Sequence, residues 1–222
     1  MYQLYIANKD TSSWSLRPWL LLKQFDIPFT ERQYLFPPKG QDNGFKAFSP
    51  TAKVPCLSDQ DSLIWDSLAI TEYIAEAHPQ AWPQQRAARA WARSACAEMH
   101  AGFVALRQHC PMVCSQRYAL IDMPVELAQD LSRLDALWQS GLTQFHGPYL
   151  AGAEFSAVDA YFAPVVLRIV AYGLPLSVAA MAYVDTLLAL PHLQAWQADA
   201  LKEAALNPSN IPELAHAKLM TP

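Results

Sequence analysis

The architecture of this chain is set by residues 53–70, which read KVPCLSDQDSLIWDSLAI. Two short apolar runs, 54–57 and 63–65, flank the polar stretch Ser58-Asp59-Gln60-Asp61, which has the length of a hairpin connection. A helix is expected from Ser67, and it must end near His78 because the residue before a proline disfavours helical conformation. The segment therefore predicts an antiparallel strand pair followed by a helix.

The residues before this segment predict a strand, a helix and a second strand. Residues 2–6 alternate as a strand does, and the helix after them carries Pro18 in its first turn, where proline is tolerated. Residues 29–35 are the second strand candidate. A loop rich in proline and glycine follows at 36–40, and a short helix is expected at 45–48. The order is βαβ, loop, ββα.

Beyond residue 83 the sequence consists of long Ala-rich and Leu-rich periodic segments without a convincing strand. The predicted helices are 85–109, 124–144, 156–172, 177–190 and 191–206. We predict an α+β protein with a mixed-sheet domain at 1–79 and an all-helical domain at 85–222. The interface between two such domains is a favoured place for a ligand cleft. The tail after Asn207 is expected to be an ordered or frayed covering strand.

Composition restricts the class of protein. The 222 residues are 52% hydrophobic, enough for a substantial core, and the net charge of −4 argues against the broad basic surface that nucleic acid requires. The N-terminus lacks the features of a signal peptide, and no stretch approaches about 18 uninterrupted apolar residues. We expect a soluble, cytoplasmic protein that binds neither membrane nor nucleic acid. The cysteines, Cys56, Cys96, Cys110 and Cys114, form no C-x-x-C pair and are expected to be free thiols.

The junction between the first strand and the first helix carries Ser12-Ser13-Trp14-Ser15-Leu16-Arg17. Hydroxyl side chains here are good helix N-caps, which is a sufficient structural explanation. A hydroxyl beside a helix N-terminus can also donate a hydrogen bond to a thiolate, whose charge the helix dipole favours. Lowering a thiol pKa by about two units corresponds to roughly 2.7 kcal/mol, which two such donors can supply.

Two further groups of residues suit a peptide ligand. Pro55 fits a strand start or edge, but a cis Val54–Pro55 bond would also turn the Val54 backbone outward for pairing with a peptide. Ser67 can cap its helix; alternatively, its hydroxyl and the amides at the helix start would receive a carboxylate while Asp66 receives an ammonium group. In this second interpretation, Asp66 and Ser67 together recognise the ammonium and carboxylate groups of an α-amino acid.

The order of Ser-Ser-x-Ser-x-Arg at 12–17, Val-Pro at 54–55 and Asp-Ser-Leu-Ala-Ile at 66–70 resembles the glutathione transferase superfamily, and the resemblance covers essentially the whole chain. It implies a thioredoxin-like N-terminal domain that binds glutathione and a helical C-terminal domain that lines the site for an electrophile. The serine motif is most similar to the serine-type classes, particularly zeta and related bacterial proteins. Trp14 stands where zeta enzymes have a cysteine, and this departure weakens the resemblance as an indication of the zeta substrate, an isomerised dicarboxylic acid.

The resemblance assigns glutathione binding to six residues: Lys39, Lys53, Val54, Pro55, Asp66 and Ser67. The last two would bind the γ-glutamyl group, the Val-Pro pair the cysteinyl backbone, and the two lysines the glycyl carboxylate. An exposed lysine is also an ordinary surface residue.

Ser12 falls on the activating serine of the family, and Ser13 is the close competitor. Serine acts there as a hydrogen-bond donor and not as a nucleophile. Glutathione is a co-substrate, no metal is required, and the resemblance implies a two-fold homodimer.

The electrophile pocket is expected between the first domain and the helix at 85–109, lined by Trp14, Met99, His100 and Phe103. Met99 and Phe103 recur at helical spacing, which is also typical of core packing. His100 is a candidate acid or base, or an ordinary hydrogen-bonded histidine. A different element, Ser156-Ala157-Val158-Asp159, fits a helix capping box and is assigned a structural role.

The resemblance implies a glutathione transferase of the detoxifying kind, which activates the thiolate for conjugation to, or isomerisation of, a small hydrophobic electrophile. One alternative is a glutathione-dependent peroxidase or thiol reductase, which usually needs a cysteine at the first helix. Another is a non-catalytic glutathione-binding module with a stress or assembly role, because one fold hosts many functions.

Overall fold

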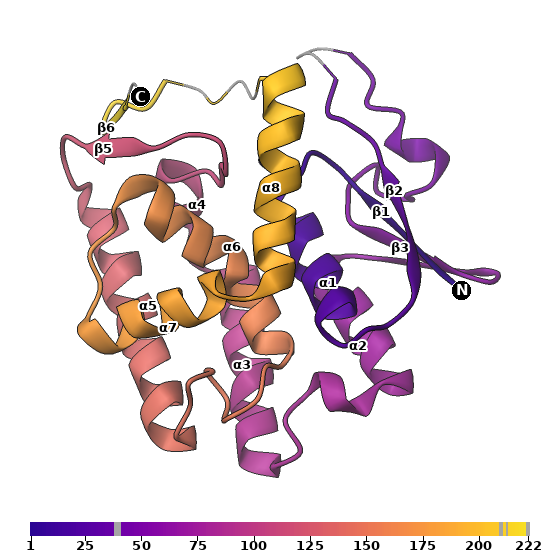
Figure 1. Cartoon of the computed structure of the whole chain (residues 1–222), viewed down its shortest axis with the longest axis horizontal. Coiled ribbons are helices and arrows are strands. Elements are labelled where there is room, and N and C mark those ends of the chain that lie inside the picture. The colour runs from indigo at the N-terminus through magenta and orange to yellow at the C-terminus, as the bar shows by residue number, and fades with distance from the viewer. Residues whose placement is uncertain (38–40, 209–210, 212, 221–222) are drawn as a thin grey trace.

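The computed structural model describes residues 1–37, 41–208, 211 and 213–220, and places a mixed sheet beside a group of helices (Figure 1). The sheet has the strand order β2-β1-β3-β4. Its strands are β1 (Tyr2–Ile6), β2 (Phe29–Gln33), β3 (Cys56–Asp59) and β4 (Ser62–Trp65). β1 is parallel to β2 and antiparallel to β3, which pairs with β4 through a tight hairpin. The predicted fold class, α+β with a βαβ-ββα first half, is confirmed.

The two faces of β1 belong to different clusters. Leu4 and Ile6 point into the main core with the helices α1 (Ser13–Gln24) and α2 (Ser67–Ala77). Tyr5 points to the opposite face, where it stacks on Phe48, just after the short helix η1 (Phe45–Ala47). This alternation follows from the two-residue period of a strand, and it explains why the sheet is covered on both faces.

The second half begins with the short helix η2 (Pro79–Ala81) and is mostly helical. Its helices are α3 (Arg86–Ala101), α4 (Val104–His109), α5 (Val125–Phe145), α6 (Ala157–Tyr172), α7 (Val178–Leu188) and α8 (Pro191–Leu206). All residues of α6 except Val170 are buried, so this helix forms the centre of the group. None of the helices in the described part of the chain combines the length and apolar character of a bilayer span. The domain boundaries at 79 and 85 stay a prediction.

The start of α6 is closed by hydrogen bonds. The fully buried Asp159 accepts from the Ser156 amide at 2.9 Å, the Leu150 amide at 3.1 Å and the Tyr183 hydroxyl at 3.0 Å. The predicted capping box is therefore confirmed. Burial raises the pKa of Asp159 to about 6, and the hydrogen bonds to its carboxylate oppose that rise.

Two features of the second half differ from the sequence-based expectation. The helix expected over 85–109 is two helices, because the chain breaks at Gly102 and Phe103, whose φ is 52°. The Asp130 carboxylate accepts a hydrogen bond from the Leu106 amide in the first turn of α4. The half expected to lack strands also contains a two-stranded sheet, β5 (Tyr118–Leu120) paired with β6 (Ala217–Leu219).

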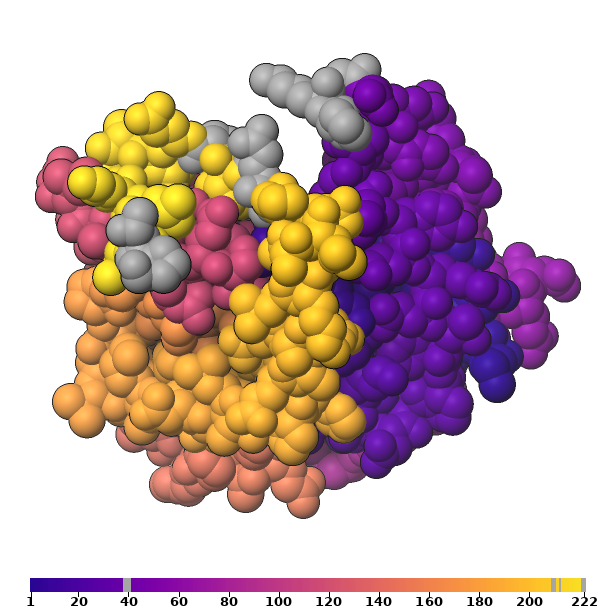
Figure 2. Space-filling view, turned by 45° about the horizontal axis from the view of Figure 1, so that its top comes forward, coloured from indigo at the N-terminus to yellow at the C-terminus, as the bar shows by residue number. Residues whose placement is uncertain are grey.

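The helix α8 stands between the sheet and the other helices (Figure 1), and Figure 2 shows it against the N-terminal half along one seam. The buried Lys9 ammonium lies 2.9 Å from a carboxylate oxygen of Glu31 and 2.9 Å from one of Asp199 on α8. The Trp196 indole donates to the Lys9 carbonyl and packs edge-on against Trp19. This contact fixes the loop after β1, and with it the start of α1.

Candidate functional site

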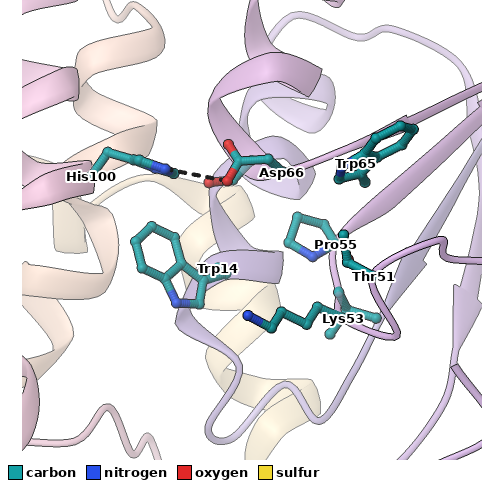
Figure 3. A pocket seen from close by; sticks show the side chains of 9 residues that line it. Trp14, Thr51, Lys53, Pro55, Trp65, Asp66 and His100 are labelled. Carbon is teal, nitrogen blue, oxygen red and sulfur yellow. Dashed lines mark ion pairs between the residues drawn. The ribbon is translucent and has the colours of Figure 1, made fainter.

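Two adjoining cavities lie along the seam between the sheet and α1. The first, of about 410 Å³, is bordered by Asp66 and Ser67 at the start of α2 (Figure 3). The second, of about 290 Å³, is bordered by Ser12 and Ser13 at the start of α1. Both cavities are also lined by three shared residues: Trp14, Lys53 and Val54. They therefore form one groove that runs from the start of one helix to the start of the other, and we call it the groove below.

Ser12 is the N-cap of α1, but its side chain makes no capping hydrogen bond to that helix. Its Oγ lies 2.7 Å from the Ser15 Oγ, which accepts a hydrogen bond from the Ala7 amide. Because the Ala7 amide occupies an acceptor position of Ser15, the Ser15 hydroxyl can donate to Ser12. The Ser12 proton is then available to an acceptor in the groove.

The Ser13 hydroxyl contacts a buried cation. A guanidinium nitrogen of Arg168, on α6, donates to the Ser13 Oγ over a long 3.4 Å, and its other nitrogens donate to the carbonyls of Cys110 and Pro164. A guanidinium cannot accept a hydrogen bond, so Ser13 accepts this one and keeps its own proton for another acceptor. Burial lowers the pKa of Arg168 to about 10, which leaves it cationic at neutral pH.

Two more guanidinium groups lie behind Trp14. Arg17 lies 3.9 Å from the centre of the Trp14 ring, and Arg107 lies 5.5 Å from it. Burial lowers the pKa of Arg17 to about 9. Among the described residues, the Arg17 Nη1 and the Arg107 Nε are buried without a hydrogen-bond partner, and the ion pairs there involve neither these two arginines nor Arg168. The α1 end of the groove therefore carries uncompensated positive charge, which favours an anion.

The other end of the groove is built on Asp66, which has a φ of 74° and caps α2. One carboxylate oxygen accepts from the Leu68 amide at 2.8 Å, and the other lies 3.2 Å from the Nε2 of His100 (Figure 3). The buried Ser67 hydroxyl lies 2.9 Å from the Tyr161 hydroxyl. The structural alternative that Ser67 caps this helix is therefore wrong, because Asp66 takes that role.

The middle of the groove is formed by the peptide bond between Val54 and Pro55, which is cis. The Lys53 side chain extends from this side of the first cavity toward Trp14 (Figure 3). Lys39, the other lysine expected at the glycyl carboxylate, lies outside the described residues. Within the described ranges, no cluster of three His, Cys, Asp or Glu side chains could hold a metal ion.

Comparison with known proteins gives this groove a context. Residues 11–77 match the family described as "Glutathione S-transferase, N-terminal domain", and the match spans both serines, the cis-proline and Asp66-Ser67. Residues 11–77 therefore form a glutathione S-transferase N-terminal domain. A curated protein named probable maleylacetoacetate isomerase, from Caenorhabditis elegans, is 33% identical over 93 residues, which are 41% of this chain and 42% of that protein.

Solved structures of glutathione transferases share the fold over nearly the whole chain. A glutathione transferase homolog from Burkholderia, with bound glutathione, is 21% identical, with 90% of this chain and 98% of that chain covered and a TM-score of 0.66. Human glutathione S-transferase T1-1 in its apo form is 23% identical, with 97% and 93% covered and a TM-score of 0.65. At these identities the likeness establishes the fold alone.

The residues expected at the electrophile pocket separate into two pairs in this glutathione transferase fold. Trp14 and His100 line the first cavity. Met99 and Phe103 are buried in the core and line neither cavity of the groove, which corrects the expectation for these two. Met99 continues the buried stripe of α3, whereas His100 lies about 100° further around the helix and faces the groove.

Sequence reasoning missed Tyr161. The side chain lies on α6, and its hydroxyl joins His100 Nδ1 at 3.0 Å to the Ser67 hydroxyl, 94 residues away in sequence. The available signal was a phenol in a largely apolar helix, because a buried tyrosine hydroxyl usually finds a partner. The partner itself could be found only from the tertiary structure.

Proposed function

We propose that this chain binds glutathione along the groove and activates its thiol for conjugation to, or isomerisation of, a small electrophile. The proposal rests on one observation above all: a single groove joins a receptor for an α-amino acid, a cis-proline segment and two hydroxyl groups at a helix start. A γ-glutamyl-cysteinyl-glycine tripeptide needs these three groups in this order. The family match over residues 11–77 supports the same ligand.

The γ-glutamyl end of the ligand would lie at the start of α2. Its ammonium group would contact the Asp66 carboxylate, and its carboxylate would contact the Ser67 hydroxyl and the free amides of the first helical turn. The cysteinyl backbone would then pair with Val54. Lys53, on the shared wall of the two cavities, is available to the glycyl carboxylate.

The thiol would lie at the start of α1, where four factors favour the anion. They are the helix dipole, the Ser12 and Ser13 hydroxyl groups, and the uncompensated arginines behind them. A charge-assisted hydrogen bond contributes about 1.5–3 kcal/mol, so one such bond can lower a thiol pKa by about one to two units. We propose Ser12 as the main donor and Ser13 as the secondary one, with the electrophile approaching beside Trp14.

The buried cysteines argue against thiol-disulfide or peroxidase chemistry carried by this chain's own thiols. All four are free and buried. Desolvation raises the pKa of Cys56 to about 11 and that of Cys110 to about 12, and it raises the pKa of Cys96 and Cys114 as well. A reactive cysteine needs the opposite shift. A homodimer, a cytoplasmic location and a role in detoxification are further parts of the proposal, carried by the resemblance alone.

Calorimetric titration with reduced glutathione tests the proposal. We expect saturable binding by the parent protein, thiolate ultraviolet absorbance of the bound ligand at neutral pH, and conjugation of a small aromatic electrophile. Asp66→Ala should weaken binding by about 10- to 100-fold, because a charge-assisted pair is lost. Asp61→Ala, in the exposed hairpin turn, is the matched control and should leave the affinity unchanged.

Two results would contradict the proposal. The first is the absence of saturable binding, and the second is an unchanged affinity in Asp66→Ala. Binding and thiolate formation without any conjugation would instead favour the non-catalytic module.

A further inference from the structure

The carboxylate that should receive the ligand's ammonium group is already occupied. The Asp66 Oδ1 accepts from the Leu68 amide, and the Oδ2 contacts the His100 imidazole at 3.2 Å. Figure 3 shows His100 reaching this carboxylate from the opposite wall of the first cavity. The oxygen not needed for capping α2 is thus held by a side chain of α3.

The imidazole is held at both nitrogens. Its Nδ1 lies 3.0 Å from the Tyr161 hydroxyl, which contacts Ser67. Neutral His100 donates from Nε2 to Asp66 and accepts from Tyr161. Protonated His100 donates at both nitrogens, so all of its hydrogen bonds are kept while it gains a positive charge. Burial raises the pKa of Tyr161, and its hydroxyl therefore stays protonated throughout.

We propose that His100 is a positioning residue that competes, when protonated, with the α-ammonium group of glutathione for Asp66. The inference rests on the proposed function, because it concerns the γ-glutamyl end of that ligand. It makes affinity for the amino end of the ligand dependent on the charge of one histidine in the helical half. The tripeptide should therefore bind more weakly at pH 5.5 than at pH 7.5.

Charge balance decides the direction of the effect. A bound ammonium group and a protonated imidazole would share one carboxylate oxygen, which leaves one positive charge in excess. The ligand carboxylate would lie at Ser67, one hydroxyl group further from His100, so attraction to it is weaker than this repulsion. Arg17 of α1, which lies over the Tyr161 ring, and Lys53 of the same cavity add positive charge and do not offset it.

The other charged groups around α3 are engaged elsewhere. Glu72 of α2 pairs with Arg93, and Arg133 of α5 pairs with Glu98. Asp66 is therefore the carboxylate that His100 and the ligand have in common. His100 and Asp66 are partly exposed, and solvent screening limits the expected effect to about three- to tenfold in affinity.

The experiment uses S-methylglutathione, whose blocked sulfur removes the titration of the thiol. Calorimetry should give about three- to tenfold tighter binding to the parent at pH 7.5 than at pH 5.5, with release of protons on binding at the lower pH. His100→Gln should bind with nearly the same affinity at both pH values and release no protons. His192→Gln, on α8 and outside both cavities, is the matched control and should keep the pH dependence of the parent.

An N-acetylated S-methylglutathione gives an independent test on the unmodified protein, because this ligand lacks the ammonium group. Its binding should lose the pH dependence. A pH-independent affinity of the parent for S-methylglutathione, or a dependence that persists in His100→Gln, overturns the role of His100 and leaves the proposed function standing. Failure of S-methylglutathione and glutathione to bind at any pH overturns both.

Discussion

Ser156 and Ser12 are the N-cap residues of α6 and α1, and the two serines have opposite roles. At the start of α6, Ser156 is followed three residues later by Asp159, whose carboxylate accepts a hydrogen bond from the Ser156 amide. At the start of α1, Ser12 is followed at the same distance by Ser15, and the two hydroxyl groups bond to each other. The first helix start is closed, whereas the second has no side-chain cap and borders the groove.

The buried charge around the two helix starts also differs in sign. Asp159 is a buried carboxylate held by neutral donors, and burial raises its pKa to about 6. Arg17 and Arg168 are buried guanidinium groups near the start of α1, and burial lowers their pKa values to about 9 and about 10. A capping carboxylate at position 15 would have neutralised this charge and occupied the free amides. Its absence leaves room, donors and positive potential for an anionic ligand.

The largest expected effect is loss of stability when the closed helix start is opened. Asp159→Ala removes the acceptor of several buried hydrogen bonds, so the free energy of unfolding should fall by about 3 kcal/mol in a denaturant titration. Asp185→Ala, an exposed carboxylate on α7, is the control and should change it by less than about 0.5 kcal/mol. An equally small change for Asp159→Ala would remove the distinction between the two helix starts.

Substitutions at the open start of α1 should lower turnover much more than they lower stability. Ser12→Ala should reduce the rate of conjugation at saturating glutathione by about 30- to 100-fold, or roughly 2–3 kcal/mol. The free energy of unfolding should fall by only about 1 kcal/mol, because the Ser12–Ser15 hydrogen bond is lost but no capping bond is. Steady-state kinetics and denaturant titration of the same preparations check both. Ser13→Ala is the matched variant with a smaller loss, and parent-like rates for both variants would reject the assignment of the serines.

A smaller expected effect is a dependence of the free energy of unfolding on pH, caused by Asp159 at the start of α6. The pKa of Asp159 in the folded protein is about 6, above the ordinary 3.8, so the folded state keeps a proton that the unfolded chain has lost between these values. The stabilisation is complete below about pH 4 and is lost as the pH rises through 6. Relative to Asp159→Asn, the parent's free energy of unfolding should fall by about 2 kcal/mol from pH 4.5 to pH 7. A constant or opposite difference would contradict a raised pKa.

The sequence predicted the elements whose ends carry a chemical signal. α8 was expected at 191–206, where Pro191 stands at its first position, and the structure has it there. The break at Gly102 and Phe103 was not predicted. Met99, Phe103 and Leu106 are all buried, so the apolar period continues across the break as it would along one helix. The strands β5 and β6 have three residues each, too few for alternation to be recognised.

The candidate site follows the same rule. Ser12, Pro55 and Asp66 lie at junctions between elements, where short motifs are readable, and the structure brings them to one groove. The contacts of His100 with Asp66 and Tyr161 join three separate elements, and no local pattern encodes them. The sequence therefore suggested the groups for a ligand, and it named His100 as a pocket residue, but it did not predict the contact of His100 with Asp66.

The Lys9 contact with α8 has a consequence for biosynthesis. Lys9 and Asp199 are 190 residues apart, and a ribosome makes the N-terminal partner long before the C-terminal one. Until α8 emerges, the Lys9 ammonium lacks Asp199 and Trp19 lacks the indole that packs against it. The surface of the sheet half that packs against α8 therefore stays uncovered in the nascent chain until α8 has been made.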